Sequence, residues 1–127
     1  SRAFKLWMSL QVFGIDAFRA AIDKGLKNAE YVEKQVAELK SWEIVSPASL
    51  GIVVFRYLPR DWKREEVNAF NQKLADALMQ SGVAFVGTTL LNGIKALRMC
   101  PINPRTTVTD LDETIITLDR LATSGVK

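Results

Sequence analysis

The chain has 127 residues, of which 48% are hydrophobic, and its formal net charge is +3. This length and apolar content predict a single soluble domain, because no stretch reaches the roughly 18 apolar residues that a membrane-spanning helix needs. Acidic residues stand among the basic ones, as in the run 60–66, which argues against a nucleic-acid partner. Histidine is absent, which removes the commonest general base and the commonest zinc ligand.

The single cysteine, Cys100, cannot form a disulfide within the chain. It therefore indicates a reducing compartment and a cytoplasmic location, and we expect it to be buried as a small apolar residue. The apolar run 6–10 is short and no small-residue cleavage site follows it, so we do not interpret it as a signal peptide.

The first forty residues are expected to form two helices. Residues 3–13 are apolar on nearly every side, and Gly14 is expected to end this first helix. Residues 15–41 then place apolar side chains at helical spacing on one face and Lys, Glu and Gln on the other. Since a small domain rarely buries a helix that is apolar all round, we expect a larger partner to cover the first helix.

Two strands are predicted next, over 42–45 and 52–57, because both segments are rich in β-branched and aromatic residues. The turn-prone residues 46–49 are expected to connect them. After Pro59, apolar residues again recur at helical spacing, and Gly82 is placed to end this third helix.

The last part of the chain contains a predicted β-hairpin over 83–89 and 94–100, with Asn92-Gly93 as the tight turn between its strands. A final helix is expected over about 108–122, with Thr107 or Thr109 as its N-cap and Gly125 beyond its end. This order of elements predicts an α+β fold, with N-terminal helices followed by a small, mainly antiparallel sheet that helices cover.

Motifs for several kinds of chemistry are missing from the sequence. It has no glycine-rich phosphate loop, and a serine hydrolase would lack its histidine base. Four carboxylates of the last helix are interpreted as complements of the helix dipole rather than as metal ligands: Asp110, Asp112, Glu113 and Asp119. Three lysines are interpreted as solvated side chains rather than as Schiff-base lysines: Lys5, Lys24 and Lys95.

Two arginines, Arg56 and Arg98, interrupt apolar strands, where a charge must find a partner or face a cleft. The strand alternation places Arg98 on the face opposite to Leu97 and Met99. This pattern alone favours a structural ion pair for Arg98 over a functional role.

Four strings, in this order, resemble the group II pyridoxal-phosphate-dependent decarboxylases, which include aromatic-amino-acid and glutamate decarboxylases. They are Phe4-Lys5-Leu6-Trp7-Met8-Ser9-Leu10 with Phe13-Gly14, Leu50-Gly51-Ile52-Val53-Val54-Phe55-Arg56, Leu97-Arg98-Met99, and Asn103-Pro104-Arg105-Thr106-Thr107. The resemblance runs through nearly the whole chain and implies the C-terminal domain of a fold similar to that of aspartate aminotransferase.

The resemblance implies that this chain works together with a large domain that is not in it. Residues 1–41 would be helices that lead to that domain, and residues 42–127 would form the small C-terminal α+β domain. Pyridoxal 5'-phosphate would be bound by the large domain and not by a lysine of this chain, so we expect the chain alone to be inactive. Complete subunits would form a homodimer.

For the site, the resemblance assigns Arg98 to substrate binding as a residue that positions the carboxylate, and it assigns no catalytic, cofactor-binding or metal-binding residue to this chain. Arg105 is interpreted as a capping or interface residue. The substrate would be an amino acid, and the strings resemble the aromatic branch more closely than the glutamate branch.

Two other readings stay open at this point. A stand-alone small ligand-binding or regulatory module would use the same scaffold without a missing partner, and would have to cover Trp7 itself or through oligomerisation. A structural interaction domain descended from such an enzyme would have no cofactor partner.

Overall fold

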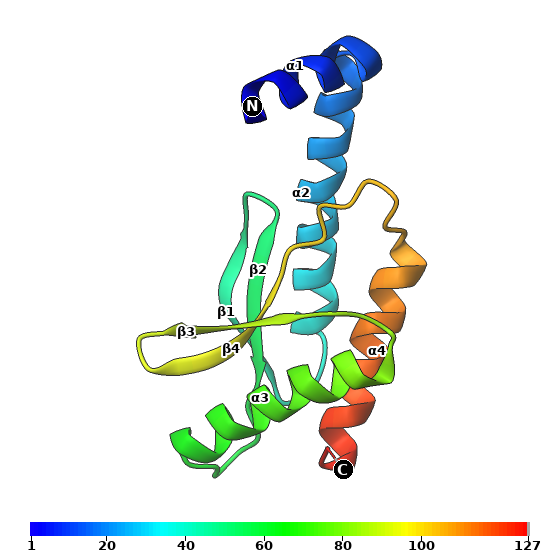
Figure 1. Ribbon diagram of the computed structural model, residues 1–127. Helices are drawn as coiled ribbons and strands as arrows, with labels where there is room; N and C mark the ends of the chain where they lie inside the picture. The colour runs from blue at the N-terminus through cyan, green and yellow to red at the C-terminus, as the bar shows by residue number, and fades with distance from the viewer. Residues whose placement is uncertain (127) are drawn as a thin grey trace.

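The computed structural model describes residues 1–126, which form four helices and four strands in the predicted order (Figure 1). The helices are α1 (Arg2–Phe13), α2 (Ile15–Ala37), α3 (Arg64–Ser81) and α4 (Val108–Ser124), and the strands are β1 (Trp42–Ser49), β2 (Ile52–Tyr57), β3 (Gly87–Leu91) and β4 (Ile94–Met99). The α+β class is confirmed.

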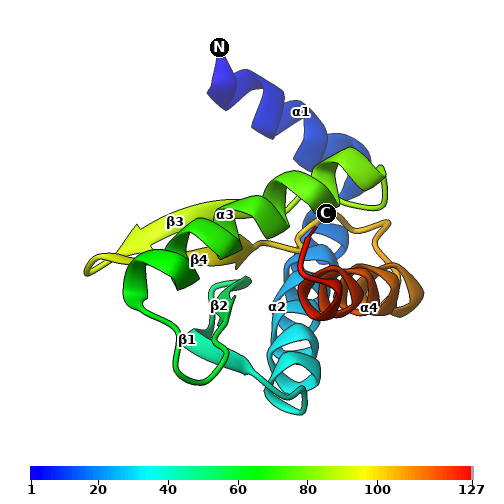
Figure 2. The ribbon, with the colours of Figure 1, turned by 90° about the horizontal axis from the view of Figure 1, so that it is seen from below.

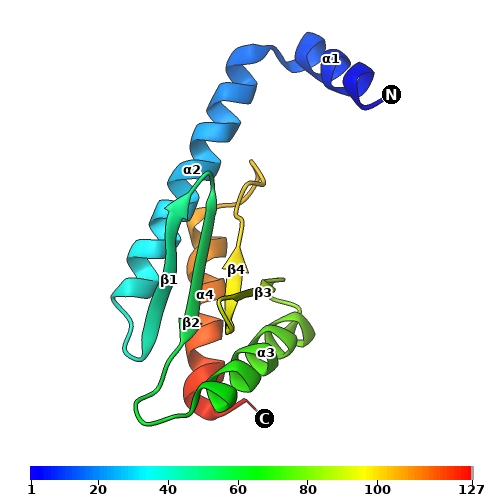
Figure 3. The same ribbon diagram turned by 90° about the vertical axis from the view of Figure 1, so that its left-hand side faces the viewer.

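The four strands form one antiparallel sheet in the order β1-β2-β4-β3, so the two hairpins lie side by side through β2 and β4. Helices α2, α3 and α4 pack on one face of this sheet, and Figure 3 looks onto the strands with α4 behind them. Figure 2 shows α4 beside α2, with α3 running beside β3 and β4.

The core lies between the sheet and the three covering helices. Its strand residues include Val53, Phe55 and Leu97, and all three are fully buried. Its helix residues come from the second half of α2 and from the inner faces of α3 and α4, and include Val32, Val36, Leu78, Leu111 and Leu118. The apolar periodicity of the sequence therefore identified the inward faces of these helices.

Helix α1 takes no part in this core, and none of its residues is buried. It lies across the start of α2, away from the sheet (Figures 1 and 3). Gly14 separates the two helices with a φ of 80°, a conformation that favours glycine, and its N–H donates to the Leu10 carbonyl at 2.9 Å. The expected end of the first helix at Gly14 is confirmed, and the expected cover of this helix by a partner stays a prediction.

The first hairpin differs from the prediction, because residues 46–49 continue β1 and do not form the turn. The turn is Leu50-Gly51, and the register between β1 and β2 shifts on either side of Ser46. Pro47 is tolerated because β1 is an edge strand with a bulge, where a missing backbone N–H breaks no ladder bond. The β-sheet context therefore overrides the turn propensity of the segment.

The second hairpin has the predicted Asn92-Gly93 turn, but β3 begins at Gly87 and not at residue 83. The tight turn fixes the pairing, so that Leu91 faces Ile94 and Gly87 faces Arg98. Because β4 ends at Met99, residues before 87 have almost no strand left to pair with.

The helix ends agree with the sequence in part. Helix α2 ends at Ala37, four residues before the predicted limit. Gly82 and Gly125 follow α3 and α4 in the left-handed conformation, as expected. Of the two N-cap candidates for α4, the structure has Thr107, whose hydroxyl accepts a hydrogen bond from the Asp110 N–H at 3.2 Å.

Candidate functional site

The sheet face that points away from the helices carries both strand arginines. Val53 and Phe55 point into the core, so alternation turns Val54 and Arg56 to the opposite face. Val54 is paired with Arg98 on β4, which places Arg98 on that same face. We call it the open face.

Arg56 is neutralised on the open face. Its Nε donates to the Glu43 carboxylate at 2.6 Å, and its side chain is only 12% exposed. Glu43 is its direct cross-strand neighbour, so the antiparallel register itself creates the pair. The expectation of a structural partner is confirmed for Arg56.

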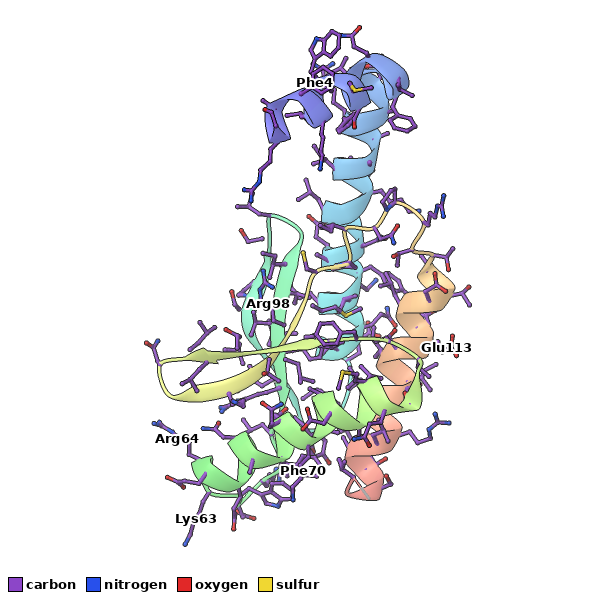
Figure 4. All side chains as sticks on the ribbon, in the orientation of Figure 1. Phe4, Lys63, Arg64, Phe70, Arg98 and Glu113 are labelled. Atoms are coloured by element: carbon purple, nitrogen blue, oxygen red, sulfur yellow. The ribbon has the colours of Figure 1, made fainter. Side chains whose placement is uncertain are left out.

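Arg98 is exposed, and among residues 1–126 no carboxylate lies within ion-pairing distance of it. The structural ion pair that the strand pattern favoured is therefore not formed. Figure 4 shows Arg98 beside the strands, far from Phe4 on α1 and from Glu113 on α4. Since the neighbouring Arg56 is already paired, Arg98 gives the open face an uncompensated positive charge that can bind a carboxylate.

The loop that follows β4 is attached to α2. The Lys24 ammonium donates to the Pro104 carbonyl at 2.6 Å, and the buried Asn28 amide donates to the Pro101 carbonyl at 3.3 Å. Gly25 lies within van der Waals distance of the Ile102 backbone, at 3.4 Å from the position that a Cβ would occupy. Polar residues on a helix normally face solvent, so no local pattern in the sequence indicated that Lys24 and Asn28 hold this loop.

Two residues that follow Arg98 in the chain had been given structural expectations. Cys100 is exposed rather than buried, because β4 ends at Met99 and the chain leaves the sheet there. Arg105 is exposed, and the cap of α4 is formed by Thr107 and Asp110 instead. The role of Arg105 at an interface stays a prediction.

Three of the four carboxylates singled out on α4, all except Glu113, accept structural hydrogen bonds, and the described residues contain no group of three or more candidate metal ligands. Asp112 accepts a hydrogen bond from the Tyr31 hydroxyl at 2.6 Å, which raises the pKa of Tyr31, since the bond favours the protonated phenol. Asp119 accepts one from the Trp42 indole N–H at 2.8 Å. These bonds join α4 to α2 and β1, a function that helix-dipole reasoning did not predict.

A continuous set of exposed apolar side chains covers α1 and the first half of α2. We call it the N-terminal apolar surface, and its large members are Phe4, Leu6, Trp7, Met8, Val12, Phe13, Ile15 and Ile22. Trp7 stacks on Phe4, and the two rings face outward together. Exposed apolar patches of this kind commonly mark interaction surfaces. Within 1–126, no helix combines the length and the apolarity that spanning a bilayer requires.

Comparison with known proteins identifies the family. The model of the pyridoxal-dependent decarboxylase conserved domain matches residues 1–58. An aromatic-L-amino-acid decarboxylase of Bacillus atrophaeus is 43% identical over 122 residues, which are 95% of this chain and 25% of that protein. The chain belongs to the pyridoxal-phosphate-dependent decarboxylases. It corresponds to their C-terminal domain, as the four sequence strings predicted.

Two further relatives of this decarboxylase chain agree with the assignment. An L-2,4-diaminobutyrate decarboxylase of Acinetobacter baumannii is 29% identical over 106 residues, which are 84% of this chain and 21% of that protein. The crystal structure of Catharanthus roseus tryptophan decarboxylase in complex with L-tryptophan has a TM-score of 0.84 and 27% identity, over 97% of this chain and 26% of that one. The decarboxylase chain thus spans about a quarter of the length of the relatives it matches.

The three lysines considered as Schiff-base candidates do not have the surroundings of a cofactor-binding lysine. Lys5 and Lys24 are exposed, and Lys95 donates to the Gln72 side-chain oxygen on α3 at 3.0 Å. A Schiff-base lysine is usually desolvated or placed beside another cation, whereas Lys5 and Lys24 are exposed to solvent and Lys95 is bonded to a neutral amide.

Proposed function

We propose that this chain completes a pyridoxal-phosphate-dependent amino-acid decarboxylase, in which a large domain outside the chain binds the cofactor. The single observation that carries the proposal is α1, a helix of a decarboxylase-family chain with apolar side chains and no buried residue. A self-sufficient ligand-binding module that is monomeric would bury Trp7, which is 56% exposed here.

The N-terminal apolar surface is where we place the contact with the large domain. The relatives are about four times as long as this chain, so most of such an enzyme lies outside it. Burial of a fully exposed large apolar side chain contributes about 1.5–3 kcal/mol, and this surface offers several. Residues 1–41 would then link the two domains, and 42–127 would form the small domain. We further propose a cytoplasmic homodimer of complete subunits.

Arg98 is the residue of this chain that we assign to the substrate. Its guanidinium is exposed, cationic and unpaired within the described residues, so it can receive an amino-acid carboxylate as a bidentate partner. Strand β4 is held between β2 and β3, which gives the side chain a rigid base. Its contribution would be orientation of the bound carboxylate, because an arginine that grips a carboxylate stabilises the ground state as well.

Aromatic amino acids are the substrates that we propose first. Support comes from the 43% identity to an aromatic-L-amino-acid decarboxylase, against 29% for a relative that acts on L-2,4-diaminobutyrate. Carbon dioxide release by the full-length enzyme should therefore be fastest with phenylalanine, tyrosine or tryptophan and slow with glutamate or 2,4-diaminobutyrate.

The test of the site is Arg98→Ala in the full-length enzyme that contains this chain. We expect the KM for the preferred amino acid to rise roughly tenfold or more, because a hydrogen-bonded charge pair contributes about 1.5–3 kcal/mol. Bound cofactor, measured by its absorbance, should be unchanged. Arg98→Lys should recover part of the loss, since it keeps the charge without the planar fork.

Arg120→Ala is the matched control, because Arg120 is an exposed arginine on α4, away from the open face. It should leave KM and kcat unchanged. Normal kinetics in Arg98→Ala would remove the role of Arg98, whereas no carbon dioxide release with any amino acid tested would contradict the proposed function itself.

A further inference from the structure

The turns of the two β-hairpins have nearly the same φ angles but different residues. Leu50 and Gly51 have φ angles of 51° and 78°, and Asn92 and Gly93 have 50° and 77°. Positive φ at both central residues of a two-residue hairpin turn strongly favours Asn-Gly. Asn92 follows this preference, but Leu50 does not, since a bulky side chain is strained in the left-handed conformation.

Nothing inside the described chain offsets this strain. Leu50 is 86% exposed, the most exposed of the large hydrophobic side chains. A leucine that is both strained and solvated gains nothing from its own domain. Strained, exposed residues of this kind occur where a partner makes use of them.

The backbone of the turn, by contrast, is firmly held. Gly51 is buried, and a Cβ there would lie 3.3 Å from the Ile102 side chain and 3.8 Å from the Gly25 carbonyl of α2. This packing fixes the direction in which Leu50 projects. Leu50 also forms one wall of an apolar groove whose other wall is α2, with Ile22 and Leu26.

The groove joins the turn to the N-terminal apolar surface. Ile22 belongs to both, and the tip of the β1–β2 hairpin points toward the end of the molecule where α1 lies (Figures 1 and 3). We infer that Leu50 is an anchor that inserts into an apolar site on the cofactor-binding domain, with the groove as part of the same contact. The inference rests on the proposed function, because the partner is the large domain that the proposed enzyme has outside this chain.

The direction in which Leu50→Asn shifts the thermal unfolding midpoint distinguishes an anchor from a residue that only forms the turn. If Leu50 only forms the turn, Leu50→Asn relieves strain and should raise the thermal unfolding midpoint of the full-length enzyme. If Leu50 is an anchor, the same change should lower that midpoint and speed limited proteolysis between the domains roughly tenfold, as expected from the exposure of a buried leucine.

The reciprocal change provides the control. Asn92→Leu introduces the same strain at the other turn, so it should lower the midpoint of the enzyme without speeding cleavage between the domains. An unchanged or higher midpoint in Leu50→Asn, with normal proteolysis between the domains, would overturn the inference.

A photoreactive amino acid at position 50 of the purified full-length enzyme identifies the segment that contacts this position. We expect cross-links to peptides of the cofactor-binding domain, and none from the same amino acid at position 92. Cross-links from position 50 only to another copy of residues 1–127, or no cross-links, would overturn the assignment. These readouts do not use decarboxylation, so an enzyme without activity but with the cross-link would contradict the proposed function and leave the contact standing.

Discussion

At the scale of single residues, hydrogen-bond partners decide roles that residue type leaves open. Arg56 and Arg98 both interrupt apolar strands, but only Arg56 has a carboxylate directly opposite. In the same way, Thr107 and Thr109 were equal candidates for the N-cap of α4. In the structure, Thr107 and Asp110 form a reciprocal pair of hydrogen bonds that caps the helix. The presence of a partner within hydrogen-bond reach therefore separates a structural side chain from one without a structural bond.

Asp110 gives the first residue-scale prediction. The Thr107 backbone N–H donates to its carboxylate at 2.8 Å and, with a further contribution from the Thr107 hydroxyl, holds the pKa of Asp110 below its usual value. A lowered folded-state pKa means that the stabilisation is present above about pH 3.9 and is lost as the pH falls through the folded value. Asp110→Asn should therefore lower the free energy of unfolding at pH 7, and the difference from the native chain should shrink toward pH 3.

Urea unfolding at the two pH values measures this difference. Glu113→Gln is the control, because Glu113 is an exposed carboxylate of the same helix that accepts no hydrogen bond within the described residues. The free energies of unfolding of Asp110→Asn and the native chain could also differ by the same amount at pH 7 and pH 3. That result would show that the charge of Asp110 does not stabilise the helix end.

At the scale of elements, two asparagines of α3 attach the helix to the sheet. Asn71 is fully buried, donates to the Tyr57 carbonyl at 2.9 Å and accepts from the Tyr57 N–H at 2.9 Å. Asn68, one turn earlier, does the same for the start of β4, with bonds to the Gly93 carbonyl and the Lys95 N–H. The backbone groups at these two places in the sheet thus have hydrogen-bond partners on the helix, as buried polar atoms require.

Asn71→Ala should destabilise the chain by about 3 kcal/mol, because both backbone groups of Tyr57 lose their partner and a fully buried side chain is removed from the core. Asn68→Ala should cost only about 1 kcal/mol, since Asn68 is half-buried and water can replace its side chain. Equilibrium unfolding in urea compares the two variants. Equal losses would mean that burial of the bonded groups does not set their contribution.

At the scale of the whole molecule, the chain has a packed domain and a helix that the domain does not use. The packed part runs from the second half of α2 to the end of α4, and α1 stands apart from it. The division into 1–41 and 42–127 stays a prediction, and the core already includes Val32 and Val36 of α2.

Trp7→Asp tests whether α1 is a docking element. Because Trp7 is 56% exposed and α1 has no buried residue, the change should leave the fold of this chain intact. In a two-piece enzyme it should weaken association with the large domain roughly tenfold or more, measured by titration calorimetry. Leu90→Asp, an exposed apolar position on β3, is the control and should bind normally. Equal affinity in Trp7→Asp would show that α1 lies outside the contact.

The sequence by itself determined the order of the elements, the α+β class, the helix-ending glycines and the family, because apolar periodicity, glycine conformation and ordered strings are local properties. It also predicted that α1 is apolar on nearly every side, and none of its residues is buried. Only the tertiary structure decided that 46–49 continue a strand, that Arg56 has a carboxylate partner and Arg98 has none, and that Leu50 is strained and solvated. Each of these depends on cross-strand register, which brings together residues far apart in the sequence and which no local pattern encodes.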